Sequence, residues 1–277
     1  MISPDALLYI YEIRGDSGVG PSAPPRSFIG LWNEEGFLYL FFTRSEDAYV
    51  QEIACGLVSV PVSRNVMSYR DWQAGLPRAG LTIGGVHFVP DDHSAPPSGS
   101  VLLDPSVVFG DGTHLTTVCC LRNMQRIFRS CSIASLLDLG TGSGILALAA
   151  ARMGVRHVLA VDRNRLAVRT AERNVLRNSL THAITVQEGE ARLFIDRPFD
   201  MVAANLPFQV LRDLCALPGM SRHRFWIVSG INQAQAVTIA DLFLERGFEV
   251  LRQWNSPPWV TISLTRNNAV SVSQLES

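Results

Sequence analysis

The sequence contains no lysine: all 24 basic residues among its 277 positions are arginine, a bias typical of GC-rich genes. It has no apolar run near the roughly 20 residues that span a bilayer. A secretory signal begins with basic residues, and none precedes Arg14. The five cysteines lack C-x-x-C spacing, and the six histidines lack the spacing of metal ligands. We therefore expect reduced thiols, a cytoplasmic location and no bound metal.

Charge is unevenly distributed along the chain. Residues 1–95 carry six arginines against eleven acids, whereas residues 96–277 carry eighteen arginines against fourteen acids. An acidic N-terminal region opposes binding to a phosphate backbone, so nucleic-acid binding is not expected, and a basic protein partner is favoured. An ordinary solvated surface explains the same asymmetry equally well.

Residues 1–66 have the pattern of a small α+β domain. Strands are expected at residues 7–13, 28–32, 37–42 and 57–62, and the turn at residues 33–36 predicts a hairpin between the second and third. A helix is expected at residues 45–55, with Ser45 as its N-cap and Gly56 as its end.

Residues 67–266 have the pattern of a larger α/β domain, followed by a flexible polar tail at residues 267–277. A strand is expected at residues 81–89 and a helix at residues 116–128, before strands and helices begin to alternate. Later strands are expected at residues 135–139, 157–162, 184–188, 200–205, 225–231, 248–253 and 259–265, with a helix at 235–246. This order predicts a doubly wound, mostly parallel sheet with one antiparallel edge strand.

A glycine loop follows the strand at residues 135–139. Asp138 lies near the end of that strand, and Gly140-Thr141-Gly142-Ser143-Gly144 leads into a helix-forming run. One glycine suffices for a turn, so three alternating ones indicate a ligand close to the backbone. Their G-x-G-x-G spacing differs from the G-x-G-x-x-G of a pyrophosphate loop and points to a nucleoside without phosphate.

Two further motifs end strands of the same sheet. Asp162, followed by Arg163, lies 22 residues after Gly140 and can accept hydrogen bonds from both ribose hydroxyls. A strand-end acid can also cap the next helix, although Asn164 is available for that purpose. Asn205-Leu206-Pro207-Phe208 suits an acceptor amine, which the Asn205 amide would orient beside the Phe208 ring, but it is equally a turn signal.

A glycine-rich segment at residues 104–117 precedes the helix at 116–128. Thr116 and Thr117 can each cap that helix or contact a ligand, and Phe109 suits the core as well as a binding site. In an open α/β sheet the carboxyl ends of the strands converge at the switch point. A nucleoside held by a loop and an acid, next to an amine site, is the arrangement of an S-adenosylmethionine-dependent methyltransferase.

The same motifs resemble those of the seven-stranded, Rossmann-like methyltransferases. Residues 104–117 resemble the D-P-G-x-A-F-G-T-G-x-H-x-T-T signature of the ribosomal-protein methyltransferase family called PrmA. Residues 69–72, 83–86 and 259–260 are also similar to that family, and the resemblance covers residues 67–266.

The resemblance implies a protein N-methyltransferase with a substrate-recognition domain at residues 1–66 and S-adenosylmethionine as cofactor. It also implies a basic protein as substrate, with ribosomal proteins among the candidates. It implies cofactor contacts at Thr117, Gly140, Asp162 and Asn205, with Phe109 at the border. The loop residues Asp138, Thr141, Gly142 and Gly144, and Arg163 after the acid, complete the expected cofactor site. Asn205 and Phe208 are expected to position the acceptor, and His114 is a candidate for proton handling.

Two departures from the family pattern leave alternatives open. Ser106, Val108 and Asp111 replace Gly, Ala and Thr, which motivates a cofactor-binding relative without turnover. The Pro-aromatic pair after Asn205 is more similar to enzymes that methylate amide or base amino groups, which motivates RNA base methylation.

Overall fold

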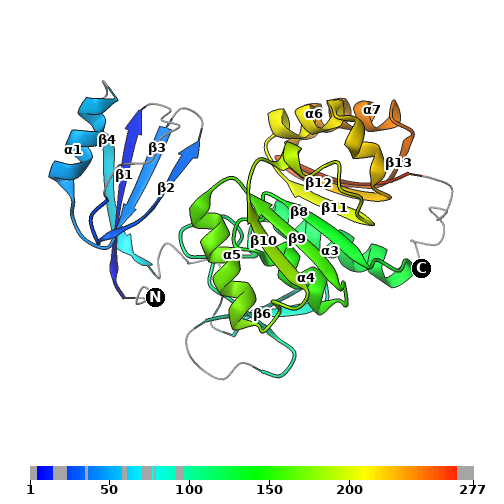
Figure 1. Ribbon diagram of the computed structural model, residues 1–277, viewed down its shortest axis with the longest axis horizontal. Helices are drawn as coiled ribbons and strands as arrows, with labels where there is room; N and C mark the ends of the chain where they lie inside the picture. Colours follow the sequence, from blue (N-terminus) through cyan, green and yellow to red (C-terminus); the bar gives the residue numbers. More distant parts are fainter. Residues whose placement is uncertain are drawn as a thin grey trace. The chain divides into compact units, whose positions relative to one another are not determined.

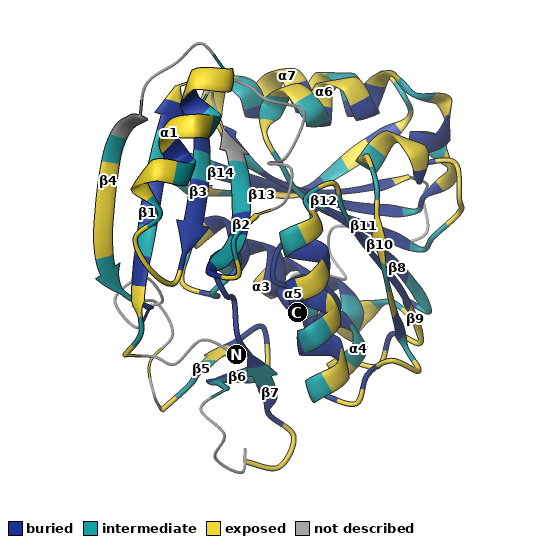
Figure 2. Cartoon of the chain, turned by 60° about the vertical axis from the view of Figure 1, so that its left-hand side comes forward, coloured by how far each residue is buried: buried dark blue, intermediate teal, exposed yellow. Residues whose placement is uncertain are grey.

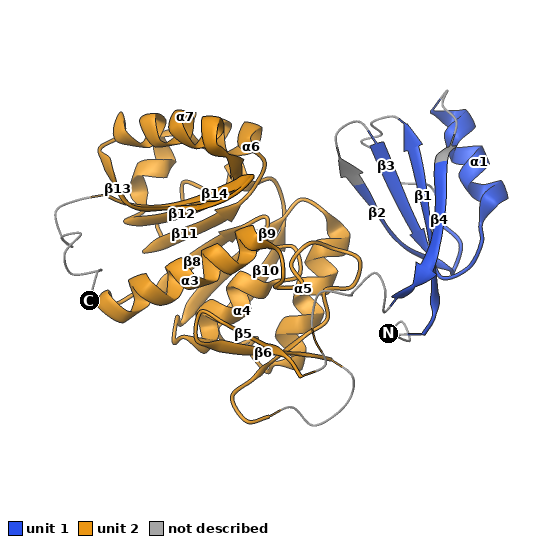
Figure 3. Ribbon diagram, turned by 180° about the vertical axis from the view of Figure 1, so that it is seen from behind, with its two compact units in different colours: residues 1–74 blue, residues 75–277 orange. Residues whose placement is uncertain are grey.

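The computed structural model describes residues 5–14, 24–34, 37–57, 61–69, 77, 79–91 and 97–266. The chain divides into two compact units, unit 1 at residues 1–74 and unit 2 at residues 75–277 (Figure 3). The domain boundary that we place between residues 66 and 67 stays a prediction. The predicted tail at residues 267–277 and the motif residues 70–72 lie outside the described residues.

Unit 1 contains an antiparallel sheet with a helix on one face. Its described strands lie in the order β2-β3-β1-β4, and they are β1 (Leu7–Arg14), β2 (Phe28–Glu34), β3 (Phe37–Phe42) and β4 (Pro61–Ser68). Helix α1 (Asp47–Gly56) buries Val50 and Ala54 against apolar side chains of β1 and β3. The predicted hairpin of β2 and β3 and the predicted helix are confirmed.

Two local predictions in unit 1 are wrong. Ser45 does not cap α1, because Glu46 is the N-cap residue and the Ser45 hydroxyl donates instead to the Asp47 carboxylate at 2.6 Å. The last strand begins at Pro61 rather than at Leu57, which caps the end of α1, and it continues to Ser68 because it pairs with β1 there. Residues 58–60 lie outside the described part.

Unit 2 contains a seven-stranded sheet, which confirms the predicted fold class. The strand order is β10-β9-β8-β11-β12-β14-β13, and the pairs from β10 to β12 are parallel. The strands are β8 (Ser135–Leu139), β9 (His157–Asp162), β10 (Ile184–Glu188), β11 (Met201–Asn205), β12 (Phe225–Asn232), β13 (Phe248–Ser256) and β14 (Trp259–Arg266). The order reverses at β8, so the switch point lies between β8 and β11.

The prediction of an antiparallel strand at the edge of the sheet is wrong. The strand that runs against the others is β14, which lies inside the sheet between β12 and β13. Six consecutive residues of β14 are buried, whereas β13 exposes residues such as Glu249 and Arg252. The hairpin therefore inserts its apolar second strand and leaves the polar first strand at the edge.

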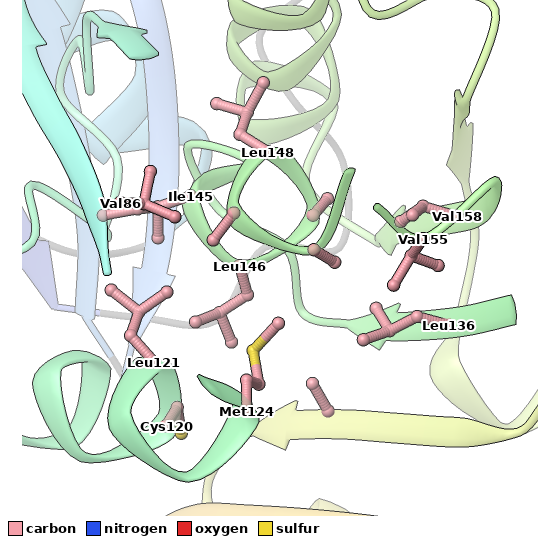
Figure 4. Close-up of a cluster of buried hydrophobic side chains, with 14 of the residues drawn as sticks. Val86, Cys120, Leu121, Met124, Leu136, Ile145, Leu146, Leu148, Val155 and Val158 are labelled. Atoms are coloured by element: carbon pink, nitrogen blue, oxygen red, sulfur yellow. The ribbon is translucent and has the colours of Figure 1, made fainter. Parts of the chain in front are cut away.

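Helices cover both faces of this sheet (Figure 1). Helices α3 (Leu115–Ser130), α4 (Ile145–Arg152) and α5 (Arg165–Arg177) pack on one face, and α6 (Phe208–Ala216) and α7 (Gln233–Leu244) pack on the other. Figure 4 shows the first of these cores, in which Leu121 and Met124 of α3 lie near Leu146 of α4. The inner strands β8, β11, β12 and β14 are almost entirely buried (Figure 2), so the carboxyl edge of the sheet is a rigid support. Two short 3-10 turns, η1 (Ala191–Leu193) and η2 (Pro218–Arg222), complete the connections.

A three-stranded sheet precedes α3. It consists of β5 (Leu81–Ile83), β6 (Val86–Pro90) and β7 (Val101–Leu103). The prediction of one continuous strand at residues 81–89 is wrong, because Gly84 and Gly85 have φ of 57° and 77° and turn the chain into a hairpin. Across the described ranges no helix is long and apolar enough to cross a membrane, and no three potential metal-ligating side chains cluster.

Candidate functional site

The glycine loop joins β8 to α4, and each of its backbone N–H groups donates a hydrogen bond to another group of the protein. The N–H groups of Gly140 and Thr141 donate to the Val161 carbonyl at 2.8 and 2.9 Å, and that of Gly142 donates to Asp162 Oδ2 at 3.0 Å. The next two N–H groups donate to the carbonyl oxygens of Phe109 and Thr141, at 2.9 and 2.8 Å. A pyrophosphate loop instead leaves such donors free for its ligand. The geometry therefore agrees with a ligand that brings no phosphate.

Asp138 stabilises the glycine loop through hydrogen bonds to its buried carboxyl group. Its carboxyl group is completely buried, and Oδ2 accepts hydrogen bonds from Thr141 Oγ1 at 2.6 Å and from the Ala147 N–H at 3.2 Å. Burial raises the pKa of Asp138 to about 7, with a smaller contribution from the charge of Asp162, although the two hydrogen bonds oppose the rise. Asp138 thus connects the strand end, the loop and the first turn of α4.

Asp162 lies at the carboxyl end of β9, next to the loop. Its Oδ2 accepts from the Gly142 N–H, and its Oδ1 accepts from the Asn164 N–H at 2.9 Å. Asn164 caps α5, so the carboxylate of Asp162 is not needed for that purpose. Burial raises the pKa of Asp162, against the effect of these hydrogen bonds and of Arg163. Each oxygen keeps a second acceptor position, which suits a diol such as ribose.

The segment at residues 104–117 lies against the glycine loop. The Ser143 N–H donates to the Phe109 carbonyl at 2.9 Å, and the Ser143 hydroxyl donates to the Gly110 carbonyl at 2.6 Å. Asn174, buried on α5, ties the two segments together by donating to the carbonyls of Asp104 and Ser143 at 2.9 and 2.8 Å. The segment at residues 104–117 and the glycine loop are therefore held together by hydrogen bonds.

Ser106 in this segment has a strained backbone, with φ of 53° at a buried position. The family signature has glycine here, which adopts this conformation without steric cost. We expect Ser106→Gly to raise the free energy of unfolding by about 1 kcal/mol, since relief of the strain exceeds the entropy that glycine adds to the unfolded chain. Urea denaturation measures the change. Ser106→Ala keeps the β-carbon and is the control; equal stabilisation by both variants would argue against strain.

A chain of hydrogen bonds connects the start of α3 to the end of β11. His114 is the N-cap of α3, and its Nδ1 accepts from the Thr116 N–H at 3.3 Å. Because Nδ1 is an acceptor, the Thr116 hydroxyl donates to it at 2.7 Å. The same hydroxyl oxygen accepts from Asn205 Nδ2 at 3.0 Å. Burial lowers the pKa of His114, so the ring is neutral at pH 7 and carries its proton on Nε2.

The remaining predicted residues lie at or near this edge in different ways. Thr117 is buried beside Thr116, and its hydroxyl has no hydrogen-bond partner among the described residues. The glycines Gly140, Gly142 and Gly144 have φ of 72°, 56° and 87°. Arg163 is exposed, and Phe208 begins α6, where it packs partly against the second core.

The rings of Phe109 and His114 lie with their centroids 5.1 Å apart, and those of His114 and Trp259 lie 5.6 Å apart, both edge to face. Sequence reasoning treated Trp259 only as part of the last strand and did not assign Asn174 to the site. The sequence did contain a signal for Asn174, because this polar residue lies on the same helix face as Ala167 and Ala171.

Comparisons with known proteins agree on one family. The profile described as ribosomal protein L11 methyltransferase (PrmA) matches residues 68–267. The L11 methyltransferase of Exiguobacterium sibiricum is 31% identical over 64% of this chain and 56% of its own length, and that of Lacticaseibacillus paracasei is 35% identical over 58% and 50%. The chain thus spans about half the length of these curated relatives. The crystal structure of a ribosomal protein L11 methylase from Lactobacillus delbrueckii subsp. bulgaricus is 28% identical, with a TM-score of 0.58, and covers 66% of this chain and 95% of its own.

Proposed function

The chain belongs to the ribosomal protein L11 methyltransferase (PrmA) family, and on that premise we propose that it transfers a methyl group from S-adenosylmethionine to an amino group of a protein. The observation that carries this proposal is the hydrogen-bonded chain that aims Asn205 at the carboxyl edge of the sheet, beside the glycine loop and Asp162.

The residues at the loop fit this cofactor. The loop offers no free N–H groups between Gly140 and Gly144 for a phosphate, whereas the Asp162 carboxylate retains acceptor positions for the two ribose hydroxyls. When bound, S-adenosylmethionine supplies a methyl group activated by a sulfonium. Gly140, Gly142 and Gly144 give the backbone conformation that brings the loop close to this ligand. The buried hydroxyl of Thr117 is a further polar group here, and it has no hydrogen-bond partner within the described ranges.

Asn205 is the residue that orients the acceptor. Its Nδ2 is engaged by Thr116, so its Oδ1 is the atom left to accept from the N–H of an incoming amine. Holding the lone pair in line with the methyl group is the main contribution, because the donor is already activated. In the neutral tautomer His114 has no nitrogen lone pair free to take a proton. We therefore assign His114 a positioning role through Thr116, and the acceptor proton goes to solvent.

The substrate we propose is a basic protein in the cytoplasm, and a ribosomal protein is the first candidate because the relatives are named for ribosomal protein L11. Unit 1 is the part that would recognise it, since the family profile begins at residue 68. The acidic balance of residues 1–95 is complementary to such a partner.

The test is incubation with methyl-tritiated S-adenosylmethionine and a ribosome-containing extract, split into protease-treated and nuclease-treated halves. We expect the label in protein, removed by protease and kept after nuclease. Loss of the label after nuclease treatment would contradict methylation of a protein and would support methylation of RNA bases instead. Binding of the cofactor without any label would replace it by a relative without turnover.

We expect Thr116→Val to lower kcat about tenfold, because Asn205 loses the acceptor that fixes its amide. Thr116→Ser keeps the hydroxyl and is expected to restore most of the rate. Steady-state kinetics and calorimetry of cofactor binding make the measurement, and the affinity for S-adenosylmethionine should change less than twofold in both variants. Equal kcat values for the Val and Ser variants would contradict the role of the hydroxyl.

A further inference from the structure

Phe109, His114 and Trp259 form what we call the aromatic wall. The three rings come from the segment before α3, the N-cap of α3 and the start of β14, and they pack edge to face at centroid distances of 5.1 and 5.6 Å. The central ring, His114, is linked through Thr116 to Asn205. The wall therefore lies next to the amide that orients the acceptor, and the function proposed above uses only His114 of its three members.

The wall is open to solvent although its backbone is fixed. The Phe109 residue is 42% exposed, while its carbonyl accepts the Ser143 N–H of the glycine loop at 2.9 Å. His114 and Trp259 are half-buried. A single exposed ring needs no explanation, but three adjacent rings at one functional edge present an apolar, electron-rich surface to a ligand.

A carboxylate lies close to this surface. Asp111 is fixed by hydrogen bonds from the Thr113 N–H and hydroxyl, both at 2.9 Å. Its charge acts on His114, where it opposes the effect of burial, which lowers the pKa of the ring. Asp111 stands where the family signature has threonine, so this negative charge is a feature of the present chain.

We propose that the aromatic wall and Asp111 form a binding site for the acceptor amino group and for the alkylated ammonium that it becomes, and this inference rests on the function proposed above. The amine reacts in its neutral form, after its proton has gone to solvent. In the transfer step the nitrogen lone pair forms the new N–CH₃ bond, and the pair of the S–CH₃ bond goes to sulfur. Positive charge therefore moves from sulfur to the acceptor nitrogen. Ring faces and a carboxylate stabilise charge at that point, and they also hold the methylated ammonium product.

The same features disfavour a nucleic-acid base. The exocyclic amine of a base loses a proton after transfer and ends neutral, so it gains little from Asp111. Rings packed edge to face, with interplanar angles of 66° and 61°, also leave no pair of parallel faces between which a flat base could stack. The wall thus favours the amino group of a protein over a base, despite the Pro207-Phe208 pair.

Binding of two matched peptides to the whole chain, saturated with S-adenosylhomocysteine, tests the site. One peptide carries trimethyllysine, and the other carries its neutral carbon isostere, with a tert-butyl group in place of the trimethylammonium. We expect the charged peptide to bind roughly tenfold more tightly by calorimetry. Trp259→Leu is expected to reduce this ratio to about one, and Asp111→Asn to reduce it about threefold.

Trp254→Leu is the matched control, because the Trp254 ring contacts the guanidinium groups of Arg126 on α3 and Arg252 on β13 and is not one of the three rings of the wall. It should leave the ratio unchanged. Equal binding of both peptides by the unmodified chain, or a Trp259→Leu ratio equal to that of the unmodified chain, would overturn the inference. Because the assay needs no turnover, absence of methyl transfer in the extract experiment would refute the proposed function without deciding this result.

Discussion

Replacement of Asp162 by alanine is expected to weaken the binding of S-adenosylmethionine about a hundredfold, because a bidentate, charge-assisted contact to the ribose is lost. The carboxylate is held in place by the backbone N–H groups of Gly142 and Asn164, so its orientation beside the glycine loop is fixed. Calorimetry of cofactor binding by the whole chain measures the effect.

Two variants separate the ribose contact from support of the loop. Asp162→Asn keeps the size of the side chain but cannot accept at both ends, so we expect about half of the loss in binding free energy. Glu172→Ala removes an exposed acid from α5 and should leave the affinity unchanged. An affinity of Asp162→Ala within threefold of the unmodified chain would remove the ribose role.

The parallel core of unit 2 could be predicted because its local signals agree. The parallel strands β8, β9, β11 and β12 are short, mainly apolar runs, and the strand at β8 is followed by glycines and a helix former. The candidate site followed from topology, since Gly140, Asp162 and Asn205 all lie at the carboxyl ends of strands that share one edge of the sheet.

What could not be predicted depends on contacts between distant segments. The interior position of β14 depends on its fit between β12 and β13. The role of Asn174 depends on the carbonyls of Asp104 and Ser143, which only the folded chain brings together. The N-cap of α3 is His114 rather than Thr116 or Thr117, because the Thr116 hydroxyl is used by the side chains of His114 and Asn205.

Asp138 shows why a motif residue need not contact the ligand. Its side chain is completely buried, and its hydrogen bonds go to Thr141 and to the start of α4. The acid at this position thus shapes the loop, and it is the loop shape that positions the Gly142 N–H against Asp162. We infer that Asp138 affects cofactor affinity through this geometry.

Gly142→Ala is expected to be the most damaging single-methyl change at the site. Gly142 has φ of 56°, and a β-carbon there would lie 2.5 Å from the carbonyl oxygen of Phe109. That oxygen belongs to the backbone and accepts the Ser143 N–H, so it cannot move without separating the two segments. We expect the free energy of unfolding to fall by about 3 kcal/mol, from the left-handed conformation and the lost contact together. Cofactor affinity should fall at least tenfold, because the Gly142 N–H also fixes Asp162.

Gly154→Ala is the matched control for the backbone strain alone. Gly154 has φ of 100°, but a β-carbon there would meet no atom within 4 Å. We expect it to lower the free energy of unfolding by about 1 to 2 kcal/mol and to leave cofactor affinity unchanged. Denaturation and calorimetry on both variants therefore isolate the collision with Phe109. Equal losses of stability in the two variants, with normal cofactor binding by Gly142→Ala, would contradict this argument. The segment at residues 104–117 would then not be a rigid support for the glycine loop.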